Sequence, residues 1–251
     1  QTTSKRYLIT NDSMVSDFEP LGPLGTVSED YISSFADGGE LKSLVSDAAG
    51  KRYLIASGLK YEVSSAAQAT ALGLDWVTAP LLTDVQISNF GDLTFGKSAT
   101  TDETFLLNGS TRALISDPEL LKTLSNMGST AVIQESVLNG FTLVSPVSQL
   151  VQDSSGNRFD IESGLKVPVA SQAVAASLGH NWATATTIDT AKLSRVATAA
   201  FLKTPTGTSS YFLSGSTKHL VISSAMLTSM AKFGSTATVS ADYLSKLDRK
   251  S

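Results

Sequence analysis

The chain has 251 residues, of which 41% are hydrophobic and 17% are charged, and its formal net charge is −4. This length allows one large domain, two ordinary domains or several small repeats. The negative charge argues against nucleic acid as the main partner, which needs a concentrated basic surface, and the absence of cysteine excludes disulfides and thiolate metal sites.

The first predicted repeat, residues 1–40, is incomplete. Residues 4–9 align with residues 110–115, but the leading strand and the outer arm of a hairpin have no counterpart. A strand without its partner is an exposed sheet edge, which proteins usually avoid. No signal peptide is visible at the start, so we expect residue 1 to be a cleavage point inside a longer array. No apolar run approaches the roughly 18 residues that a membrane helix needs.

The strands are clearest in the second predicted repeat, residues 41–91. A short strand at 44–46 leads into a hairpin with arms at 51–55 and 60–63. The turn is expected at Ser57 and Gly58, because two-residue hairpin loops favour glycine.

A helix of about two turns is expected to follow each hairpin. In the second repeat Ser65 can cap it, with Gln68 three residues later and Gly73 as the C-terminal stop. In the third repeat the capping box is expected at 116–119, with Gly128 as the stop. Both patterns predict short helices with defined ends.

A second short helix is expected after a short extended stretch in each repeat. The stretch ends at an apolar residue, namely Val27, Leu82, Ile133, Ile188 or Val239. The helix should then begin at the next residue, namely Ser28, Thr83, Gln134, Asp189 or Ser240. Four of these five residues are of types that favour the N-cap.

The order of elements recurs at fixed distances. Residues 156–171 align with residues 50–65 without a gap, at an offset of 106. Within this register, the hairpin glycines are 51, 55 and 51 residues apart: Gly58, Gly109, Gly164 and Gly215. We therefore predict an α+β fold of small antiparallel sheets, each with two short helices, in tandem repeats paired as 106-residue super-repeats. The predicted boundaries are 1–40, 41–91, 92–146, 147–197 and 198–251.

The sequence offers no set of residues typical of catalysis. His180 and His219 are the two histidines; they align with Leu74 and Ala113, so both are expected to be structural. Catalysis needs one asymmetric constellation, whereas repeats supply equivalent surfaces. We therefore expect no enzyme activity, no catalytic residue, no cofactor and no bound metal.

A basic residue recurs on the return arm of every hairpin. These residues are Arg6, Lys60, Arg112, Lys166 and Lys218. One interpretation is a row of sites for an anionic polymer, in which weak contacts multiply by valency. The other, which we favour, is a solvent-facing position that guards a strand edge.

Two tryptophans, Trp76 and Trp182, stand at equivalent positions 106 residues apart. Stacked aromatic rings can bind sugars, but they more often anchor the packing of a small fold. Alanine replaces the tryptophan in the third and fifth repeats, so a sugar site would exist only once per pair. We favour the packing role.

Two segments of the second repeat resemble a known family. They are residues 51–63, Lys-Arg-Tyr-Leu-Ile-x-x-Gly-x-Lys-x-x-Val, and residues 71–76, Ala-Leu-Gly-Leu-Asp-Trp. They resemble wall-associated tandem repeats of actinobacterial secreted proteins, which are appended to peptidoglycan hydrolases and amidases. Similar repeats form the extracytoplasmic part of the type VII secretion component EccB. This chain departs from the pattern where Asp160 corresponds to Leu54 and where Glu62 replaces a proline.

The resemblance implies a non-catalytic module that holds a secreted protein at a Gram-positive cell wall. Its partner would be peptidoglycan, teichoic acid, another glycan or a surface protein. One alternative is a structural spacer or protein scaffold, as in a secretion apparatus or adhesin stalk. Another is a carbohydrate-targeting accessory domain of a glycoside hydrolase.

Overall fold

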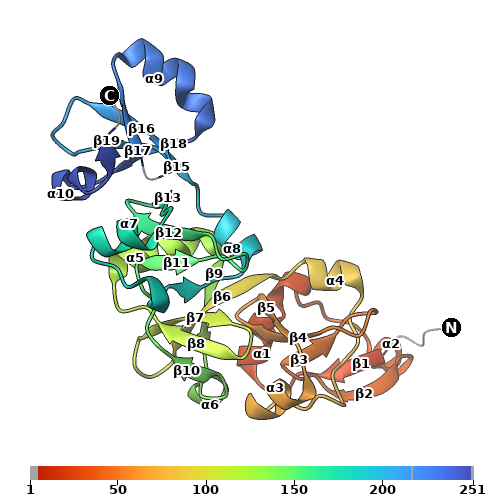
Figure 1. The fold of residues 1–251 in the computed structure, drawn as a ribbon. Coiled ribbons are helices and arrows are strands. Elements are labelled where there is room, and N and C mark those ends of the chain that lie inside the picture. The colour runs from red at the N-terminus through yellow and green to blue at the C-terminus, as the bar shows by residue number, and fades with distance from the viewer. Residues whose placement is uncertain (1–4, 216, 250–251) are drawn as a thin grey trace. The chain divides into compact units, whose positions relative to one another are not determined.

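The structure is a computed structural model that describes residues 5–215 and 217–249. These residues form a mixed α+β protein with several small sheets and ten short α-helices. It divides into two compact units. Figure 1 labels the helices and strands of both. Of the described residues, those up to Ala113 and Gly128–Val144 form unit 1. Leu114–Met127 and the residues from Ser145 onward form unit 2.

Unit 1 holds a two-stranded and an eight-stranded sheet. Their strands are β1 (Lys5–Leu8), β2 (Ala36–Glu40), β3 (Leu44–Ser46), β4 (Arg52–Ala56), β5 (Leu59–Val63), β6 (Gly91–Ser98), β7 (Thr104–Asn108), β8 (Thr111–Leu114), β9 (Ser129–Ile133) and β10 (Thr142–Val144). The small sheet is β1-β2, and the large one has the order β10-β8-β7-β6-β5-β4-β3, with β9 also paired to β6.

Unit 2 holds a four-stranded sheet, β13-β12-β11-β14, and a five-stranded sheet, β18-β15-β16-β17-β19. The strands are β11 (Leu150–Gln152), β12 (Arg158–Glu162), β13 (Leu165–Pro168), β14 (Thr186–Thr187), β15 (Ala199–Lys203), β16 (Ser210–Ser214), β17 (Thr217–Val221), β18 (Ser235–Thr238) and β19 (Asp248–Arg249).

The helices are short in both units. Those of unit 1 are α1 (Asp12–Asp17), the 3-10 helix η1 (Glu19–Leu21), α2 (Glu29–Ser33), α3 (Ala66–Ala71), α4 (Asp84–Ser88) and α6 (Glu135–Leu138). Those of unit 2 are α5 (Pro118–Leu124), α7 (Gln172–Ser177), α8 (Thr190–Ser194), α9 (Ser224–Met230), α10 (Ala241–Ser245) and the 3-10 helices η2 (Ser125–Met127), η3 (Trp182–Thr184) and η4 (Ala231–Phe233). None of these described helices has the length and apolar character needed to cross a lipid bilayer.

The sheets are mixed, so the prediction of antiparallel sheets holds for each hairpin and the strand that precedes it but not for the whole sheet. β4 pairs antiparallel with β3 and β5, as predicted, but β9 pairs parallel with β6. In unit 2, β14 likewise runs parallel to β11, and β18 parallel to β15. Parallel neighbours need a long crossover connection, and the hairpin and first helix supply it in each case.

The predicted hairpin turn is confirmed. Ser57 and Gly58 join β4 to β5 with φ of +50° and +73°. Ser163 and Gly164 join β12 to β13 with φ of +50° and +82°. Two positive φ values are the type I′ geometry, whose twist matches that of the strands.

The predicted starts of the second helices are also confirmed. The N-caps of α2, α4, α6, α8 and α10 are Ser28, Thr83, Gln134, Asp189 and Ser240. The side chains of four of them accept a backbone hydrogen bond, whereas that of Gln134 does not. This difference follows the ranking of N-cap residue types.

The predicted capping box at 116–119 is wrong by one residue. Asp117, not Ser116, is the N-cap of α5, and its carboxylate accepts from the N–H groups of Glu119 and Leu120. Pro118 decides the position, because proline favours the first helical residue, where its missing N–H costs nothing. Ser65 caps α3 as predicted, and Gly73 follows that helix with φ of +71°.

Small clusters of buried apolar residues hold each unit together. In unit 1, Val45, Ile55 and Phe90 are at most 1% exposed and share a cluster with Met14 and Phe18. In unit 2, a cluster joins the two sheets and the last helix: Val167, Ala199, Leu202, Ala237, Val239, Tyr243, Leu244 and Leu247. The second cluster places residues of α10 against residues of β13.

Candidate functional site

Three of the recurring basic residues reach the C-terminal end of a short helix. Lys60 Nζ donates to the Phe90 carbonyl, just after α4. Lys166 Nζ donates to the Leu193 carbonyl of α8 at 2.8 Å. Lys218 Nζ donates to the carbonyls of Leu244, in α10, and Leu247, the latter at 2.6 Å. A cation at this end donates hydrogen bonds to carbonyls that have no partner in the helix, and it interacts favourably with the helix dipole.

The two remaining basic residues differ in their surroundings. Arg112 Nη2 donates to the side chain of Asn139, the C-cap of α6, at 2.7 Å, and its guanidinium lies 4.9 Å from the Phe105 ring. Arg6 is exposed on β1, in register with Asp37 on β2. Arg112 therefore also reaches a helix end, through a side chain instead of a carbonyl.

Burial excludes a surface role for two of these five side chains, Lys166 and Lys218. Lys166 and Lys218 are only 8% and 7% exposed, so the interpretation as solvent-facing edge positions is wrong for both. Burial lowers the pKa of the Lys166 ammonium, and the charge of Asp153 partly opposes this. A sequence pattern could locate these cations but not their partners, because each partner lies 26 to 30 residues away.

Each tryptophan is stacked under an arginine. The Arg52 guanidinium lies 4.1 Å from the centre of the Trp76 ring, and its Nε donates to the Trp76 carbonyl at 2.9 Å. The Arg158 guanidinium lies 4.0 Å from the Trp182 ring. A cation over the ring face occupies the surface on which a sugar would stack. The sequence pattern around the tryptophans does not point to these arginines, although they too stand 106 residues apart.

The Arg52–Trp76 stack gives a testable prediction. Replacing Arg52 by methionine should lower the free energy of unfolding by about 1 kcal/mol, because it removes a cation–π contact and a hydrogen bond. With Trp182 changed to phenylalanine as the background, quenching of Trp76 fluorescence by acrylamide should rise. Lys51→Met, an exposed neighbour, is the matched control. Equal quenching in both variants would show that the stack does not cover the ring.

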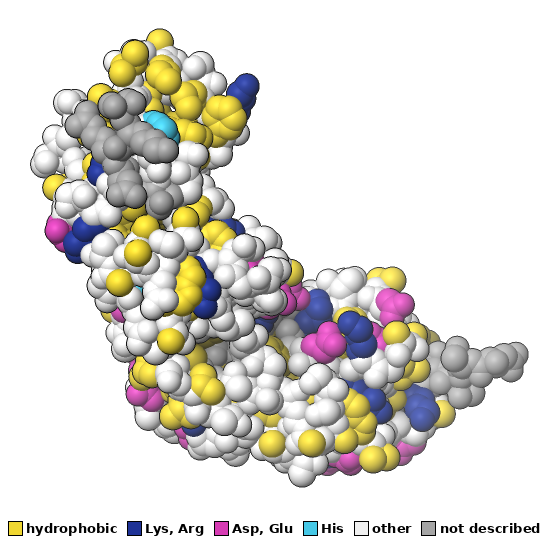
Figure 2. Space-filling view, in the orientation of Figure 1, with side chains coloured by type: hydrophobic (Ala, Val, Ile, Leu, Met, Phe, Trp, Pro, Cys, Tyr) yellow, Lys and Arg dark blue, Asp and Glu magenta, His cyan; other side chains and the backbone are white. Residues whose placement is uncertain are grey.

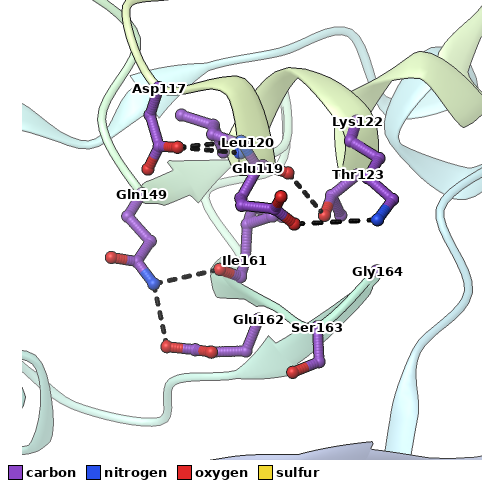
Figure 3. Close-up of a pocket in the computed structure, with 10 residues that line it drawn as sticks. All are labelled: Asp117, Glu119, Leu120, Lys122, Thr123, Gln149, Ile161, Glu162, Ser163 and Gly164. Atoms are coloured by element: carbon purple, nitrogen blue, oxygen red, sulfur yellow. Dashed lines mark hydrogen bonds and ion pairs between the residues drawn. The ribbon is translucent and has the colours of Figure 1, made fainter.

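Unit 2 contains an open cavity of about 330 Å³ between α5 and the turn of the β12–β13 hairpin (Figure 3). Leu120 and Ile161 line it together with Glu119, Lys122 and Ser163. Figure 3 shows the α5 side chains facing those of the hairpin across this space. The cavity thus combines apolar surface with both hydrogen-bond donors and acceptors.

Gln149 and Glu162 form the ordered side of this cavity. Gln149 Nε2 donates to Glu162 Oε1 at 2.9 Å and to the Ile161 carbonyl at 3.1 Å. Burial raises the pKa of Glu162, and so does the nearby charge of Asp160, while the bond from Gln149 opposes them. The side chains of Glu119 and Lys122, which are 84% and 80% exposed, form an ion pair with 3.8 Å between Oε2 and Nζ.

The two histidines, both predicted to be structural, lie in different surroundings. His180 Nε2 lies 3.0 Å from Oδ1 of Asp160, whose side chain is fully buried. His219 lies on β17 opposite Phe212 of β16. Among the described residues, no three His, Asp or Glu side chains are placed to hold a metal ion.

Exposed apolar side chains lie on and beside α9 in unit 2. Ile222, Met226 and Phe233 are 82%, 39% and 57% exposed, and Figure 2 shows hydrophobic side chains gathered over this helix. α9 has no buried residue, whereas α3, α5 and α7 each have at least one. The described part of the chain therefore leaves this helix less covered than its counterparts.

The comparisons with known proteins add no identification. No protein-family model matches the sequence, and no curated protein matches it.

Proposed function

We propose that this chain is a non-catalytic tandem-repeat module that serves as a structural spacer or protein scaffold in a secreted protein. The observation that supports it is a contact between the first helical segment of one predicted repeat and the hairpin of the next. Three such contacts are direct, and in the fourth case the helix and the hairpin pack against one shared apolar cluster. These contacts link neighbours in series, which is typical of repeat proteins.

Two of these contacts lie in unit 1. The carboxylate of Asp17, at the end of α1, accepts from the N–H of Ser57 in the β4–β5 turn at 2.5 Å. Gln68 Nε2 of α3 donates to the carbonyl of Gly109, in the β7–β8 turn, at 2.9 Å. Tyr61 Oη donates to the same carbonyl at 2.8 Å. Each turn is thereby fixed by the repeat before it.

The other two contacts lie in unit 2. α5 packs against β12, and the cavity described above lies where it meets the turn at Ser163 and Gly164. Val174 and Leu178, from α7 and its C-cap, pack with Leu213 of β16 around one apolar cluster. These contacts support the proposed tandem arrangement, because each links one predicted repeat to the next along the chain.

The recurring polar groups favour a scaffold over a row of ligand sites. Lys60, Lys166 and Lys218 bind helix ends within the fold, and both tryptophans are covered by arginine. A polymer that bound every repeat would need these groups at the surface. A scaffold uses them internally, and the resemblance to the EccB repeats of a secretion apparatus also favours a scaffold.

The cavity of unit 2 favours a second candidate, the binding of a wall polymer. Pockets that bind polar ligands combine apolar walls with a few placed donors and acceptors. Leu120 and Ile161 supply the first, and Gln149, Glu162 and Ser163 the second. A glycan or peptide segment of peptidoglycan has matching hydroxyl, amide and amine groups.

Co-sedimentation with purified wall sacculi, with and without teichoic acid, separates the two functions. The scaffold predicts that the chain stays in the supernatant like an albumin control. Polymer binding at the cavity predicts sedimentation that falls about tenfold in Gln149→Ala/Glu162→Ala, the loss of about 1.4 kcal/mol of affinity. The matched control is Lys51→Ala/Glu62→Ala, which removes an exposed ion pair of unit 1. Sedimentation of wild type and cavity variant alike would contradict both assignments.

A further inference from the structure

A buried ionic pair in unit 2 stands at two positions that are leucine in unit 1. Leu54 on β4 is 2% exposed, and in the 106-residue alignment it and Leu74 correspond to Asp160 and His180. Asp160 lies on β12 and is 0% exposed. Burying a carboxylate costs free energy unless a partner compensates its charge. Because both positions change together, the two polar residues form a matched replacement.

The imidazole of His180 is the group that compensates this carboxylate. Its Nε2 lies 3.0 Å from Asp160 Oδ1, and its side chain is 17% exposed. Neither Asp160 oxygen has a well-aligned hydrogen bond to another group in the described part of the chain. His180, when it is protonated, is therefore the group that can balance a charge on Asp160.

The same carboxylate acts electrostatically on the hydroxyl of Tyr243, which belongs to α10 and has no well-aligned hydrogen bond in the described part of the chain. Tyr243 is 7% exposed, and burial followed by the charge of Asp160 raises the pKa of its hydroxyl. Tyr243 and Leu244 pack with Val167 and Leu202 in the cluster that joins α10 to the two sheets. A change in the charge balance around Asp160 therefore acts on Tyr243, a residue through which α10 packs.

Three charged groups from the surrounding elements act on His180. Asp160, through its contact and its charge, and Glu162, both on β12, favour the imidazolium. Lys246, which follows α10, opposes it, and so does the partial burial of the ring. The balance raises the pKa of His180 above its ordinary value of 6.5.

We propose that Asp160, His180 and Tyr243 form a pH-sensitive latch that holds α10 against β12 while His180 is protonated. Deprotonation leaves the carboxylate buried beside a neutral ring and a neutral phenol, so the latch loosens. A histidine with a raised folded pKa contributes stability that is fully present below its unfolded pKa of about 6.5 and is lost as the pH rises through the folded pKa. The latch is therefore closed in mildly acidic solution and opens toward alkaline pH.

Proton NMR of the whole chain tests the titration directly, because only two histidines contribute ring signals. The signal that disappears in His219→Gln identifies His219, and the other belongs to His180. We expect His180 to titrate above pH 6.5, and hydrogen exchange of the α10 amides to accelerate through the same titration. A His180 midpoint at or below 6.5 would overturn the proposal.

Thermal unfolding of variants tests the coupling to stability. The melting temperature of unit 2 should fall by about 5 °C as His180 loses its proton, the shift expected for a small part of a domain's stability. Asp160→Leu/His180→Leu, which restores the apolar pair of unit 1, should remove this dependence, and His180→Leu alone should lower the melting temperature below its value in wild type. Glu162→Gln removes the titrating carboxyl of Glu162, so that its effect on stability can be distinguished from that of His180. An unchanged pH slope in the double variant would contradict the latch, and if this variant does not fold, the His180 midpoint decides.

Discussion

Replacing Lys218 by methionine is expected to lower the free energy of unfolding of unit 2 by about 2 kcal/mol. The ammonium donates to the carbonyls of Leu244 and Leu247, and the residue is 7% exposed. Methionine has a similar length but no donor, so both carbonyls lose a charge-assisted bond. Relief from burying the ammonium offsets part of this loss, because an apolar side chain has no such desolvation cost.

Chemical denaturation followed by circular dichroism measures this effect. Lys122→Met is the matched control, since that side chain is 80% exposed and should change stability by less than about 0.5 kcal/mol. Lys60→Met should lie between the two, because the Lys60 side chain is 20% exposed and reaches one carbonyl. Equal stability of the Lys218 and Lys122 variants would show that the recurring cation does not support the helix end.

Replacing Gly140 by alanine should destabilise unit 1 by about 3 kcal/mol, a large overpacking effect. A Cβ at this position would overlap the Ala71 carbonyl oxygen and lie 2.7 Å from the Cα of Leu72. These are backbone atoms at the end of α3, so they cannot move aside as a flexible side chain can. Gly140 therefore permits the chain after α6 to pass close to α3.

Gly25→Ala is the control for this substitution. No atom lies within 4 Å of a Cβ built on Gly25, and its φ is not in the left-handed region. Its stability should stay within about 0.5 kcal/mol of wild type, as for other surface changes. A Gly140→Ala protein with the same denaturation midpoint as Gly25→Ala would mean that the α6–β10 connection is free to move.

The sequence predicted those features that depend on neighbouring residues. N-caps and type I′ turns are decided within a few positions, so Ser28, Thr83 and the turn at Ser57–Gly58 could be located from the sequence. Asp117 was missed because the effect of Pro118 outweighs the capping-box pattern. The parallel pairs β6–β9 and β15–β18 were not foreseen, since strand partners far apart in sequence leave no local signal.

The candidate sites were harder to predict for a related reason. The cations at Lys166 and Lys218 could be found by their spacing, but their burial depends on where α8 and α10 end in space. The cavity arises where α5 meets a hairpin about 40 residues later, which neither segment reveals alone. The Asp160–His180 pair did leave a signal, namely two simultaneous departures from leucine in aligned positions.

The division of the chain between the units has a practical consequence for dissecting the protein. Leu114–Met127 belong to unit 2, yet β9 follows them and pairs with β6 in unit 1. The backbone therefore passes from one unit to the other three times, and a single peptide-bond break within residues 114–127 leaves the two still covalently joined. Deletion from either end cannot yield one intact unit without fragments of the other.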